Sequence, residues 1–534
     1  MTERRTQAQI PLKQFYTPED TITLNYETQL NSPGRYPFTR GRQADLYGAS
    51  GWIQRELSGE GDPVRSNEQI KYLISQGQMG IDVIGDSPSM AMLDPDHTLA
   101  ANAVGTQGVS LCCLDDYQEL YKGIPLDSIS VSSSLPPIFA LAGLYLVAKE
   151  GGVSPRRLRG SVLQTPFYAE DCGYAMQMPF NLRLRLSLDS MEFCARKMPK
   201  FHSFVEDTYF FSESGLNVVE EMALGFVEIR HLVREMIKRG VDIDSFAPRI
   251  AILVNCGMDF FEEIAKMRAT RRLFARMMKE EFGAKDPRSL AVVITCHTSG
   301  LSLTAQQPFN NIVRGAVQTL SLVLAGVQAI EVSAFDEAYR TPSKESHLVG
   351  LRTQQVIHLE TGVAKVTDPL GGSYFIETLT NEIESRIWGM VQDIEAKGDP
   401  AELSYEGWFR RFFQDAMERY GKQINEGRLL KVGANVHQIP DEEDTMLKEF
   451  TEKKFEPCWD RIEKIRLYKK GRNQKKNKEV LQKVHQAAKQ PKASLVEPVL
   501  AAFADGATMG EIAGVMRLAY DYPYDPHGLL EPPI

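Results

Sequence analysis

The sequence predicts an α/β protein built on a (β/α)₈ barrel of the TIM type, and two features of its pattern lead to this class. Short runs rich in β-branched residues recur eight times, and amphipathic helical patterns separate many of them. Strands that alternate with helices pair in parallel through right-handed crossovers, and eight such units close into a barrel. An active site is then expected at the carboxyl ends of the strands.

The expected elements follow in chain order. The strands are predicted at 80–84, 108–112, 128–132, 160–164, 202–206, 249–255, 291–296 and 328–332. Apolar residues that recur three and four positions apart predict the intervening helices. The clearest of these helical patterns lie at 136–149, 218–239, 260–281, 307–324 and 344–360.

Two further regions flank the predicted barrel domain of residues 61–395. Residues 1–60 contain Pro33-Gly-Arg-Tyr-Pro-Phe-Thr-Arg-Gly41, which cannot bury itself and predicts an extended arm that wraps the barrel or a partner. Residues 396–534 predict a helical C-terminal region with a proline-rich tail. Its helices are expected at 404–426, 441–468, 494–504 and 509–519, and the tail at 521–534.

A basic stretch at 469–478 interrupts the C-terminal helices. It forms either a solvated helix face or linker, or a docking site for an acidic partner.

Composition narrows the class of protein. The chain has 534 residues, 43% hydrophobic and 25% charged, and no apolar run reaches the roughly 18 residues of a membrane span. The polar first thirty residues predict no signal peptide, and the net charge of −9 argues against nucleic acid as the main partner. Seven scattered cysteines indicate buried thiols in a reducing cytoplasm. Rossmann, P-loop and His-Glu-x-x-His motifs do not occur.

Several motifs resemble one enzyme family over roughly residues 30–395. The arm motif at 33–41 is followed by Phe246-Ala-Pro-Arg-Ile250, Thr298-Ser-Gly-Leu-Ser-Leu-Thr-Ala-Gln306, Asn310-Asn-Ile-Val-Arg314 and Asp368-Pro-Leu-Gly-Gly-Ser373. Together they resemble the methylmalonyl-CoA mutase family of adenosylcobalamin-dependent acyl-CoA mutases. The resemblance implies an isomerase that rearranges a carbon skeleton by radical chemistry.

One part of the family's cofactor site does not occur in this sequence. Single-chain relatives carry an Asp-x-His-x-x-Gly motif whose histidine binds cobalt, whereas here the nearest match, Asp525-Pro-His-Gly-Leu-Leu530, lacks the final glycine and leaves His527 in the tail. The resemblance therefore implies the large subunit of a two-protein mutase, with no metal ligand of its own. It implies a small cobalamin-binding partner of roughly 130–150 residues, which carries the motif, and an α₂β₂-type heterotetramer.

Most cofactor positions of the family are kept. Glu337 falls on the glutamate that holds the adenosyl ribose, and Glu213 on a glutamate near the corrin. His297 stands where relatives have a glutamine near adenosine, or is simply a barrel-mouth histidine with satisfied bonds. The glycines match positions of close approach to the ring. The implied cofactor set is Gly59, Glu213, His297, Gly300, Glu337 and Ala338.

The substrate positions differ from those of methylmalonyl enzymes. Gly173 aligns with an arginine that pairs with the substrate's free carboxylate, and Leu57 replaces a tyrosine over the methylmalonyl group. A buried carboxylate requires such a charged partner. The resemblance thus implies an acyl group without a free carboxylate, branched or hydroxylated.

Two polar contacts to the thioester carbonyl are also replaced. Tyr209 is kept, but the histidine after it is Phe210, and a neighbouring glutamine is Leu163. Loss of a donor aimed at developing charge costs a few kcal/mol of barrier. Asp82 is a candidate replacement, or else a buried structural ion pair or helix cap.

In 2-hydroxyacyl-CoA mutases an aspartate recognises the substrate hydroxyl. Its position here is Ile84, and Asp82 lies on the same expected strand face and is the alternative contact. The site therefore departs from methylmalonyl-, isobutyryl- and 2-hydroxyisobutyryl-CoA mutases alike.

The CoA contacts are mixed. Arg55 and Arg249 match two arginines that bind CoA, and Ser161 replaces a threonine, but Asp45 replaces another threonine and would repel phosphates if it faced them. The substrate set is Arg55, Leu57, Asp82, Ile84, Ser161, Leu163, Gly173, Tyr209, Phe210 and Arg249.

The leading hypothesis is the catalytic large subunit of a cobalamin-dependent mutase that acts on a carboxylate-free acyl-CoA. A second hypothesis keeps the mutase but replaces the thioester substrate. A third is a non-catalytic barrel paralogue that serves as a binding or assembly partner.

Overall fold

The sheet confirms the predicted barrel class. The structure is a computed structural model that describes residues 4–48, 50–171, 177–451 and 456–534. Nine parallel strands lie in the order β1-β9-β8-β7-β6-β5-β4-β3-β2. β1 and β2 are one run interrupted at Glu56, and they stand at the two ends of this order, so the sheet has eight strand positions and nearly closes on itself. The strands are β1 Ile53–Arg55, β2 Leu57–Ser58, β3 Gly80–Ile84, β4 Ser130–Ser134, β5 Arg159–Gln164, β6 Phe201–Asp207, β7 Ile250–Cys256, β8 Val293–Thr298 and β9 Ala329–Glu331.

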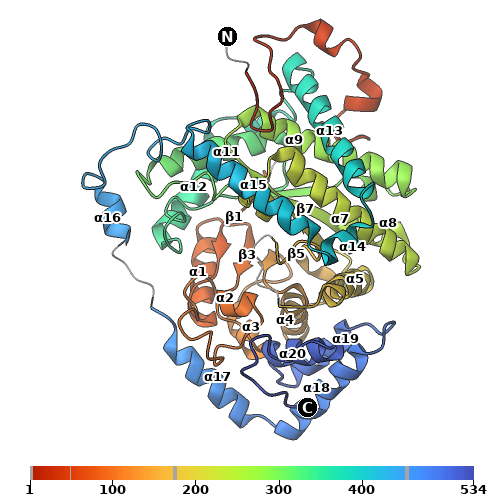
Figure 1. The fold of residues 1–534 in the computed structure, drawn as a ribbon, viewed down its shortest axis with the longest axis vertical. Helices are drawn as coiled ribbons and strands as arrows, with labels where there is room; N and C mark the ends of the chain where they lie inside the picture. Colours follow the sequence, from red (N-terminus) through yellow and green to blue (C-terminus); the bar gives the residue numbers. More distant parts are fainter. Residues whose placement is uncertain (1–3, 49, 172–176, 452–455) are drawn as a thin grey trace. The chain divides into compact units, whose positions relative to one another are not determined.

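Helices follow most strands, and further helices form the C-terminal region (Figure 1). No helix within the described residues has both the length and the apolar composition of a membrane span. The helices are α1 Pro63–Ser75, α2 Ser87–Met90, α3 Leu114–Tyr121, α4 Pro137–Glu150, α5 Phe180–Lys197, α6 Tyr209–Glu213, α7 Val218–Lys238, α8 Ile243–Phe246, α9 Phe260–Arg276, α10 Pro287–Leu290, α11 Asn310–Ala325, α12 Lys344–Glu360, α13 Tyr374–Glu395, α14 Pro400–Tyr405, α15 Trp408–Asn425, α16 Thr445–Thr451, α17 Trp459–Gly471, α18 Gln474–Ala488, α19 Val496–Ala504 and α20 Met509–Ala519.

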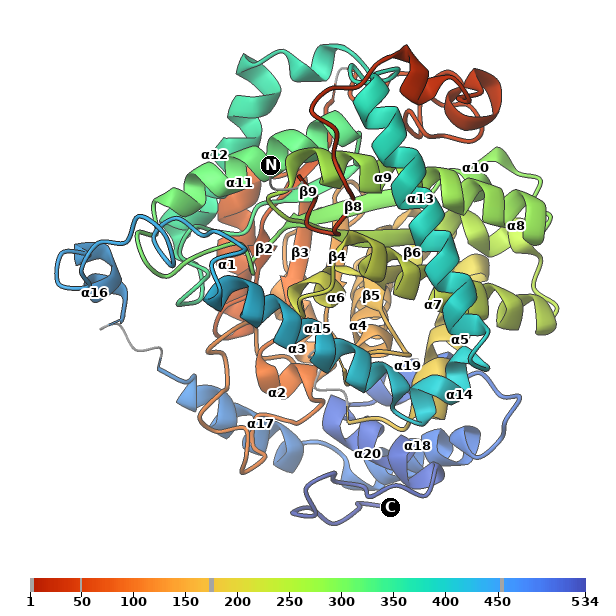
Figure 2. The same cartoon turned by 45° about the horizontal axis from the view of Figure 1, so that its top comes forward.

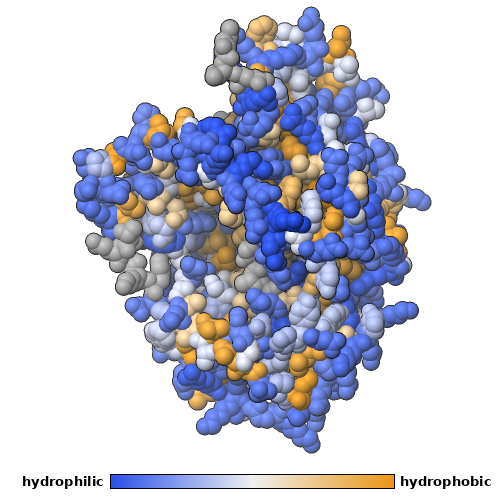
Figure 3. Space-filling view, in the orientation of Figure 1, coloured by the Kyte–Doolittle hydropathy of each residue, from blue (hydrophilic) through white to orange (hydrophobic). Residues whose placement is uncertain are grey.

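Contacts divide the chain into two compact units. The first unit comprises Met1–Glu56 and Glu206–Lys453, and the second comprises Leu57–Val205 and Lys454–Ile534. Each unit therefore contributes its own set of strands to the sheet. The face shown in Figure 3 is largely hydrophilic, with apolar side chains scattered over it, as the balance of charged residues leads one to expect.

Helix α9 is the central support of the first unit. It packs against α7, α11 and α13, and Figure 2 shows α13 running beside it. Arginines of α9 also hold the N-terminal segment: Arg271 donates to the carbonyls of Phe38 and Thr39, and Arg272 donates to that of Gln29. The turn-rich stretch at 33–41 thus lies against α9.

The second unit has a continuous apolar core between its strands and helices. Ile81 and Val83 of β3, Val131 of β4 and Val162 of β5 belong to this core, together with residues of α4, α18, α19 and α20. Because side chains alternate along a strand, Asp82 and its neighbours on the alternate positions face the other side of the sheet.

Two sequence predictions of secondary structure are wrong. Residues 108–112 form no strand, since Val109 makes only isolated bridges to Gly61 and Gly85. The run is apolar because it is a buried loop. The missing barrel strand is β1–β2. Further along, the single helix predicted over 441–468 is two helices, α16 and α17.

The basic stretch at 469–478 is partly neutralised inside the second unit. Lys469 pairs with Asp94 and Asp96, and Arg472 pairs with Glu511. Lys476 also pairs with Asp505. These contacts support the solvated-face interpretation over an acidic docking site, because three of its cations already have partners.

Candidate active site

Four polar side chains form one register row at the carboxyl ends of the first unit's strands. Arg55 of β1 is paired with Glu331 of β9, Glu331 with His297 of β8, and His297 with Asn255 of β7. All four are at most 7% exposed. The alternate residues Ile330, Cys296 and Val254 are buried apolar side chains, so the row faces away from them.

The row is linked by direct contacts. His297 Nε2 lies 3.2 Å from Glu331 Oε2, an ion pair whenever the imidazole is protonated. Arg55 donates to the hydroxyl of Thr295, two residues before His297 on β8. The ring of Tyr209, at the start of α6, meets the ring of His297 edge to face with centroids 5.0 Å apart. Tyr209 and His297 thus stand in one site.

Glu213, at the end of α6, is held by three protein donors. Its carboxylate accepts hydrogen bonds from Asn255 Nδ2 (2.7 Å), Ser299 Oγ (2.8 Å) and the backbone N–H of Leu301 (2.7 Å). Burial raises the pKa of Glu213, and these donors oppose the rise. The carboxylate is therefore fixed in place by β7 and the loop after β8.

A buried lysine supports Asn255 from below. Lys266 Nζ donates to Asn255 O (2.7 Å) and lies 2.8 Å from Glu221 Oε2 and 2.7 Å from Glu263 Oε2. Burial alone would lower the pKa of Lys266, but the carboxylates of Glu221 and Glu263 raise it above its usual value. The lysine thus stays charged and anchors the end of β7.

Carboxyl groups gather around Tyr209. Burial raises the pKa of Glu337 to about 7, with the charges of Glu331 and Glu213 adding to the rise and His297 opposing it. Burial, and then Glu213, Glu337 and Glu331, raise the pKa of Tyr209 well above its usual value. Tyr209 is therefore a neutral phenol, and Glu337 is divided between its two protonation states near pH 7.

The glycine and alanine positions differ in kind. A Cβ on Gly300 would stand 3.1 Å from Glu213 Oε2 and 3.3 Å from the Tyr209 hydroxyl, so glycine there leaves room beside both groups. Gly59 has φ +145°, and a Cβ on it would stand 2.4 Å from the carbonyl oxygen of Ile84, so its own backbone requires glycine. Ala338 is exposed after the turn that carries Glu337.

The second unit carries its own register row. Leu57 of β2 is paired with Asp82 of β3, Asp82 with Ser132 of β4, and Ser132 with Ser161 of β5. The hydroxyls of Ser132 and Ser161 are 2.6 Å apart. Three predicted substrate residues, Leu57, Asp82 and Ser161, therefore lie in one row on one face of this unit's strands, with Ser132 between the last two.

The remaining substrate residues of this unit lie one step further along the strands. Ile84 follows Asp82 on the same face of β3, and its partner Ser134 is 3.5 Å from Asp82 Oδ1. Leu163 follows Ser161 on β5 and is buried. Gly173 lies outside the described residues.

Arg249 lies at the other end of the strands, just before β7 begins. It is half-buried, and its pKa is lowered by burial and by the nearby charges of Arg42 and Arg288. Arg42 in turn donates to the carbonyl of Ala291. Asp45 is exposed and accepts the N–H of Gly48 (2.8 Å), so it caps its own turn.

Phe210 follows Tyr209 on α6 and packs edge to face against it, with ring centroids 5.4 Å apart. The phenylalanine side chain has no hydrogen-bond donor, so it cannot bond to a substrate carbonyl. Among the described residues, the imidazole beside the same tyrosine belongs to His297.

Sequence reasoning did not single out Glu331, Asn255 or Ser299. A signal was present for Glu331, because a lone acid in the middle of an apolar strand pattern marks the face turned away from the helices. Asn255 and Ser299 carried no signal of their own, since their role depends on the three-dimensional position of Glu213.

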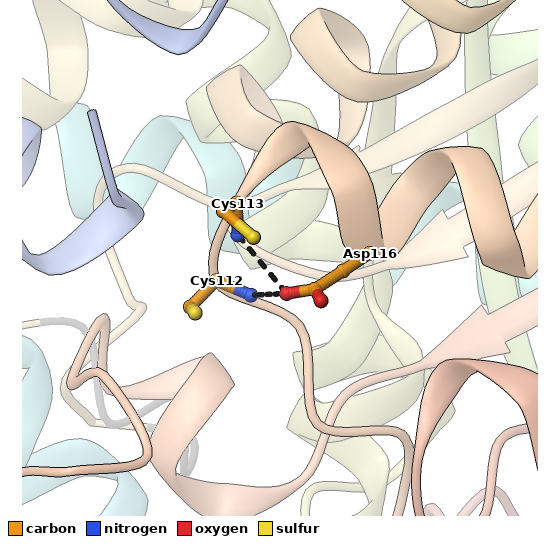
Figure 4. A group of neighbouring side chains, drawn as sticks. All are labelled: Cys112, Cys113 and Asp116. Atoms are coloured by element: carbon orange, nitrogen blue, oxygen red, sulfur yellow. Dashed lines mark hydrogen bonds between the residues drawn. The ribbon is translucent and has the colours of Figure 1, made fainter. Parts of the chain in front are cut away.

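One cluster of possible metal ligands has a structural role instead. Cys112, Cys113 and Asp116 could reach one ion, but Asp116 Oδ2 accepts the backbone N–H groups of both cysteines, at 2.8 and 3.1 Å (Figure 4). Arg461 also pairs with Asp116 and lies 3.6 Å from Cys112 Sγ. Burial raises the pKa of Cys112 well above its usual value, so the thiol stays protonated. The group caps α3.

A polar row at the carboxyl ends of barrel strands, with a neutral tyrosine and a carboxyl group of raised pKa beside it, is the arrangement of a TIM-barrel enzyme. The sequence profile of the family described as Methylmalonyl-CoA mutase matches residues 5–522. The chain belongs to the methylmalonyl-CoA mutase family, and it is an isomerase of the mutase type with a cobalamin cofactor and acyl-CoA chemistry.

Similar proteins cover nearly the whole chain. The 2-hydroxyisobutanoyl-CoA mutase large subunit of Aquincola tertiaricarbonis is 33% identical, over 95% of this chain and 90% of its own length. The methylmalonyl-CoA mutase of Rhizobium meliloti (strain 1021) is 33% identical, over 96% of this chain and 72% of its own. That of Escherichia coli (strain K12) is 31% identical, over 96% and 71%.

Proposed function

We propose that the chain is the catalytic large subunit of an adenosylcobalamin-dependent mutase that isomerises a branched or hydroxylated acyl-CoA without a free carboxylate. The observation that carries this proposal is Gly173, which stands where methylmalonyl enzymes have the arginine that pairs with the substrate carboxylate. The carboxyl groups around Tyr209 add to it. Glu213, Glu331 and Glu337 already raise one another's or the tyrosine's pKa. A substrate carboxylate placed there would meet repulsion rather than a bidentate arginine.

The residues present fit the adenosyl group. One carboxyl oxygen of Glu337 accepts the N–H of Ala334 (3.0 Å), and the other has no partner within the described residues, so it can accept a ribose hydroxyl. Gly300 leaves open space beside Glu213. Bound adenosylcobalamin would supply the radical chemistry that removes hydrogen from the substrate. Glu213 would pack beside the cofactor without hydrogen bonding to it, because protein donors already engage both of its carboxylate oxygens.

The chain's own residues would bind and orient the substrate. Arg249, with Arg42, would hold the phosphates of CoA at the amino ends of the strands, and Arg55 would hold the pantetheine nearer the carboxyl ends. Within the second unit, Leu57, Ile84 and Leu163 would offer apolar contacts to the acyl group, with Asp82 as the polar contact. Within the first unit, Phe210 would offer an apolar ring. Tyr209 and His297 would stand beside the reacting carbonyl, and His297 would donate the hydrogen bond that Phe210 cannot.

A separate small subunit is part of the proposal. One relative, matched over 90% of its own length, is named a 2-hydroxyisobutanoyl-CoA mutase large subunit, and such a name supports a small-subunit partner. In the proposed layout the cobalt ligand would come from that second protein. The described cysteines are free thiols, most of them buried, which supports a cytoplasmic location.

Turnover of an acyl-CoA panel tests the proposal. The chain is combined with its small cobalamin-binding partner and adenosylcobalamin, and each product is identified by mass spectrometry. Isobutyryl-CoA and 2-hydroxyisobutyryl-CoA represent the expected class, and methylmalonyl-CoA is the matched substrate with a carboxylate. Rearrangement of methylmalonyl-CoA in preference to the others would overturn the substrate class. Cofactor binding without turnover of any CoA ester would favour a mutase for a different substrate, with Asp82 as its polar contact.

A further inference from the structure

A cavity of about 370 Å³ lies within the first unit, beyond the carboxyl ends of β7 and β8. We call it the rim pocket. Its walls come from the loops after α6 and β8, the starts of α7 and α11 (Figure 1), Tyr420 of α15 and residues 429–432. The proposed function uses none of the side chains that point into it.

Two cations face the rim pocket, and neither has an acidic partner. Lys431 Nζ donates to the carbonyl of Leu301, and Arg314 donates to Thr304 Oγ1 (2.9 Å), Asn311 Oδ1 (2.6 Å) and Val432 O (2.7 Å). Within the described part of the chain, no carboxylate oxygen lies within 4.0 Å of either side chain. Arg314 is only 8% exposed, and buried charges of this kind are normally paired.

Part of the lining is apolar and open to solvent, beside polar residues such as Asn217, Ser302 and Asn310. Met258, Val313, Leu430 and Val432 all line the rim pocket, and they are 42%, 63%, 65% and 45% exposed. Exposed apolar side chains are unremarkable singly, but four around one cavity mark a binding site.

Other charged groups near the rim pocket do not satisfy its cations. Glu263 lines it too, but Lys266 and the N–H of Gly257 engage that carboxylate. Glu213 lies close enough to raise the pKa of Lys431 yet is held by three donors of its own. The net effect at Lys431 is unfavourable: burial, then the charge of Arg314, lowers its pKa to about 8.

We propose that the rim pocket binds a small organic anion, a carboxylate or phosphate that carries a short apolar group. The anionic end would lie between Lys431 and Arg314, and the apolar part against Val313, Leu430 and Val432. Such a ligand removes the repulsion between the two cations and covers the exposed apolar rim.

Ser299 and Leu301 both line the rim pocket and both donate to Glu213, and Leu301 also contacts Lys431. The carbonyl of Leu301 accepts from Lys431, and its N–H donates to Glu213. A bound anion that draws the lysine away would loosen the segment that fixes Glu213. An anion bound in the rim pocket could therefore change the position of Glu213 in the candidate active site, as an effector does.

Labelling with pyridoxal 5′-phosphate tests the proposal on the chain alone, so its outcome does not depend on the mutase assignment. The reagent carries a phosphate for Arg314 and an aldehyde for Lys431. The amine of Lys431 adds to the aldehyde carbon, water leaves as the imine forms, and borohydride then delivers a hydride that fixes the label. Peptide mapping by mass spectrometry measures the labelled fraction of each lysine at pH 8.

Lys422 on α15, an exposed lysine, is the internal reference. An amine with a pKa near 8 is about half deprotonated at this pH, against less than ~1% for an ordinary lysine, so we expect at least roughly tenfold more label on Lys431. The K431M variant should lose this label and keep that on Lys422. Label distributed according to exposure would overturn the proposal.

Protection identifies the ligand class. Inorganic phosphate or isobutyrate should reduce label on Lys431 and leave Lys422 unchanged, and the stronger protector shows whether phosphate or carboxylate is preferred. Isobutyrate should protect at roughly tenfold lower concentration than acetate if the apolar lining takes part. The exposed-rim variant V313S should weaken protection by isobutyrate alone. Protection by none of these anions would overturn the proposal.

Discussion

At the scale of single residues, Glu337 has the most pH-sensitive environment of the site. Its folded-state pKa, about 7, lies above the usual 4.5, so between these values the folded state binds more protons than the unfolded state. Stability contributed by this group is therefore greatest below pH 4.5 and falls as pH rises to 7. We expect E337Q to be more stable than the wild type at pH 8 by about 1–3 kcal/mol.

Chemical denaturation of both proteins at pH 5 and pH 8 measures this difference. The gain should shrink at pH 5, where the wild-type carboxyl is protonated in the folded state. E345Q, which changes an exposed carboxyl on α12, serves as the control and should leave stability unchanged. An equal gain at both pH values would show that the effect of E337Q is not electrostatic.

Arg249 provides a binding prediction that needs neither cofactor nor partner. Its half-buried guanidinium lies near those of Arg42 and Arg288, and their mutual repulsion favours a bound phosphate. We expect R249Q to weaken CoA binding about 10- to 100-fold, the loss of one charge-assisted hydrogen-bonding group. Isothermal titration with CoA measures the dissociation constant.

The control for this measurement is R157Q, in the second unit, where an exposed arginine pairs with Asp127. Unchanged CoA affinity in R249Q, or an equal loss in R157Q, would remove Arg249 from the proposed phosphate site.

Residue-level prediction from sequence was possible where a strand pattern fixed the face of a side chain. The alternation along residues 80–84 placed Asp82 and Ile84 on one face, and both lie at alternate positions of β3. The roles given to the site residues stay predictions. Prediction failed where a role comes from a neighbour distant in sequence. Asn255 and Ser299 matter because they bond Glu213, and neither residue type at its position predicts that contact.

At the scale of elements, seven of eight strands were predicted because parallel strands buried on both faces are continuous apolar runs. β1 and β2 escaped notice because Glu56 interrupts them and because their polar residues are typical of a loop. The run at 108–112 was misassigned for the opposite reason: a buried loop is as apolar as a strand, and only pairing distinguishes them.

The contact of α9 with α7 and β7 yields a prediction about stability. Lys266 is fully buried between Glu221 and Glu263, so K266M would leave two buried carboxylates without a cation. We expect a loss of about 3–5 kcal/mol in unfolding free energy. Because burial already raises the pKa of Glu221 to about 7, protonation should relieve part of this loss at pH 5.

Denaturant unfolding at pH 8 and pH 5 tests this prediction. K238M removes an exposed lysine of α7 that pairs with Glu235, and should cost at most about 1 kcal/mol. A K266M protein as stable as K238M would mean that the two carboxyls share a proton without help from the lysine.

At the scale of the whole molecule, the proposed function depends on a second protein. In that proposal the free carboxyl oxygen of Glu337 would accept a hydroxyl of the adenosyl group, and the cobalt ligand would come from the small subunit, because this sequence contains no match to the family's cobalt-binding motif. Tight cofactor binding should then require that subunit.

This requirement gives the final prediction. The chain alone should bind adenosylcobalamin weakly, and addition of the small subunit should produce both tight binding and a stable complex. Two chains of 60.0 kDa with two partners of roughly 130–150 residues give a mass of about 150 kDa. Size-exclusion chromatography with light scattering measures that mass, and the absorbance of cobalamin across the same peak measures occupancy. Tight binding by the isolated chain would contradict the two-protein arrangement, whereas a complex of another mass would correct only its stoichiometry.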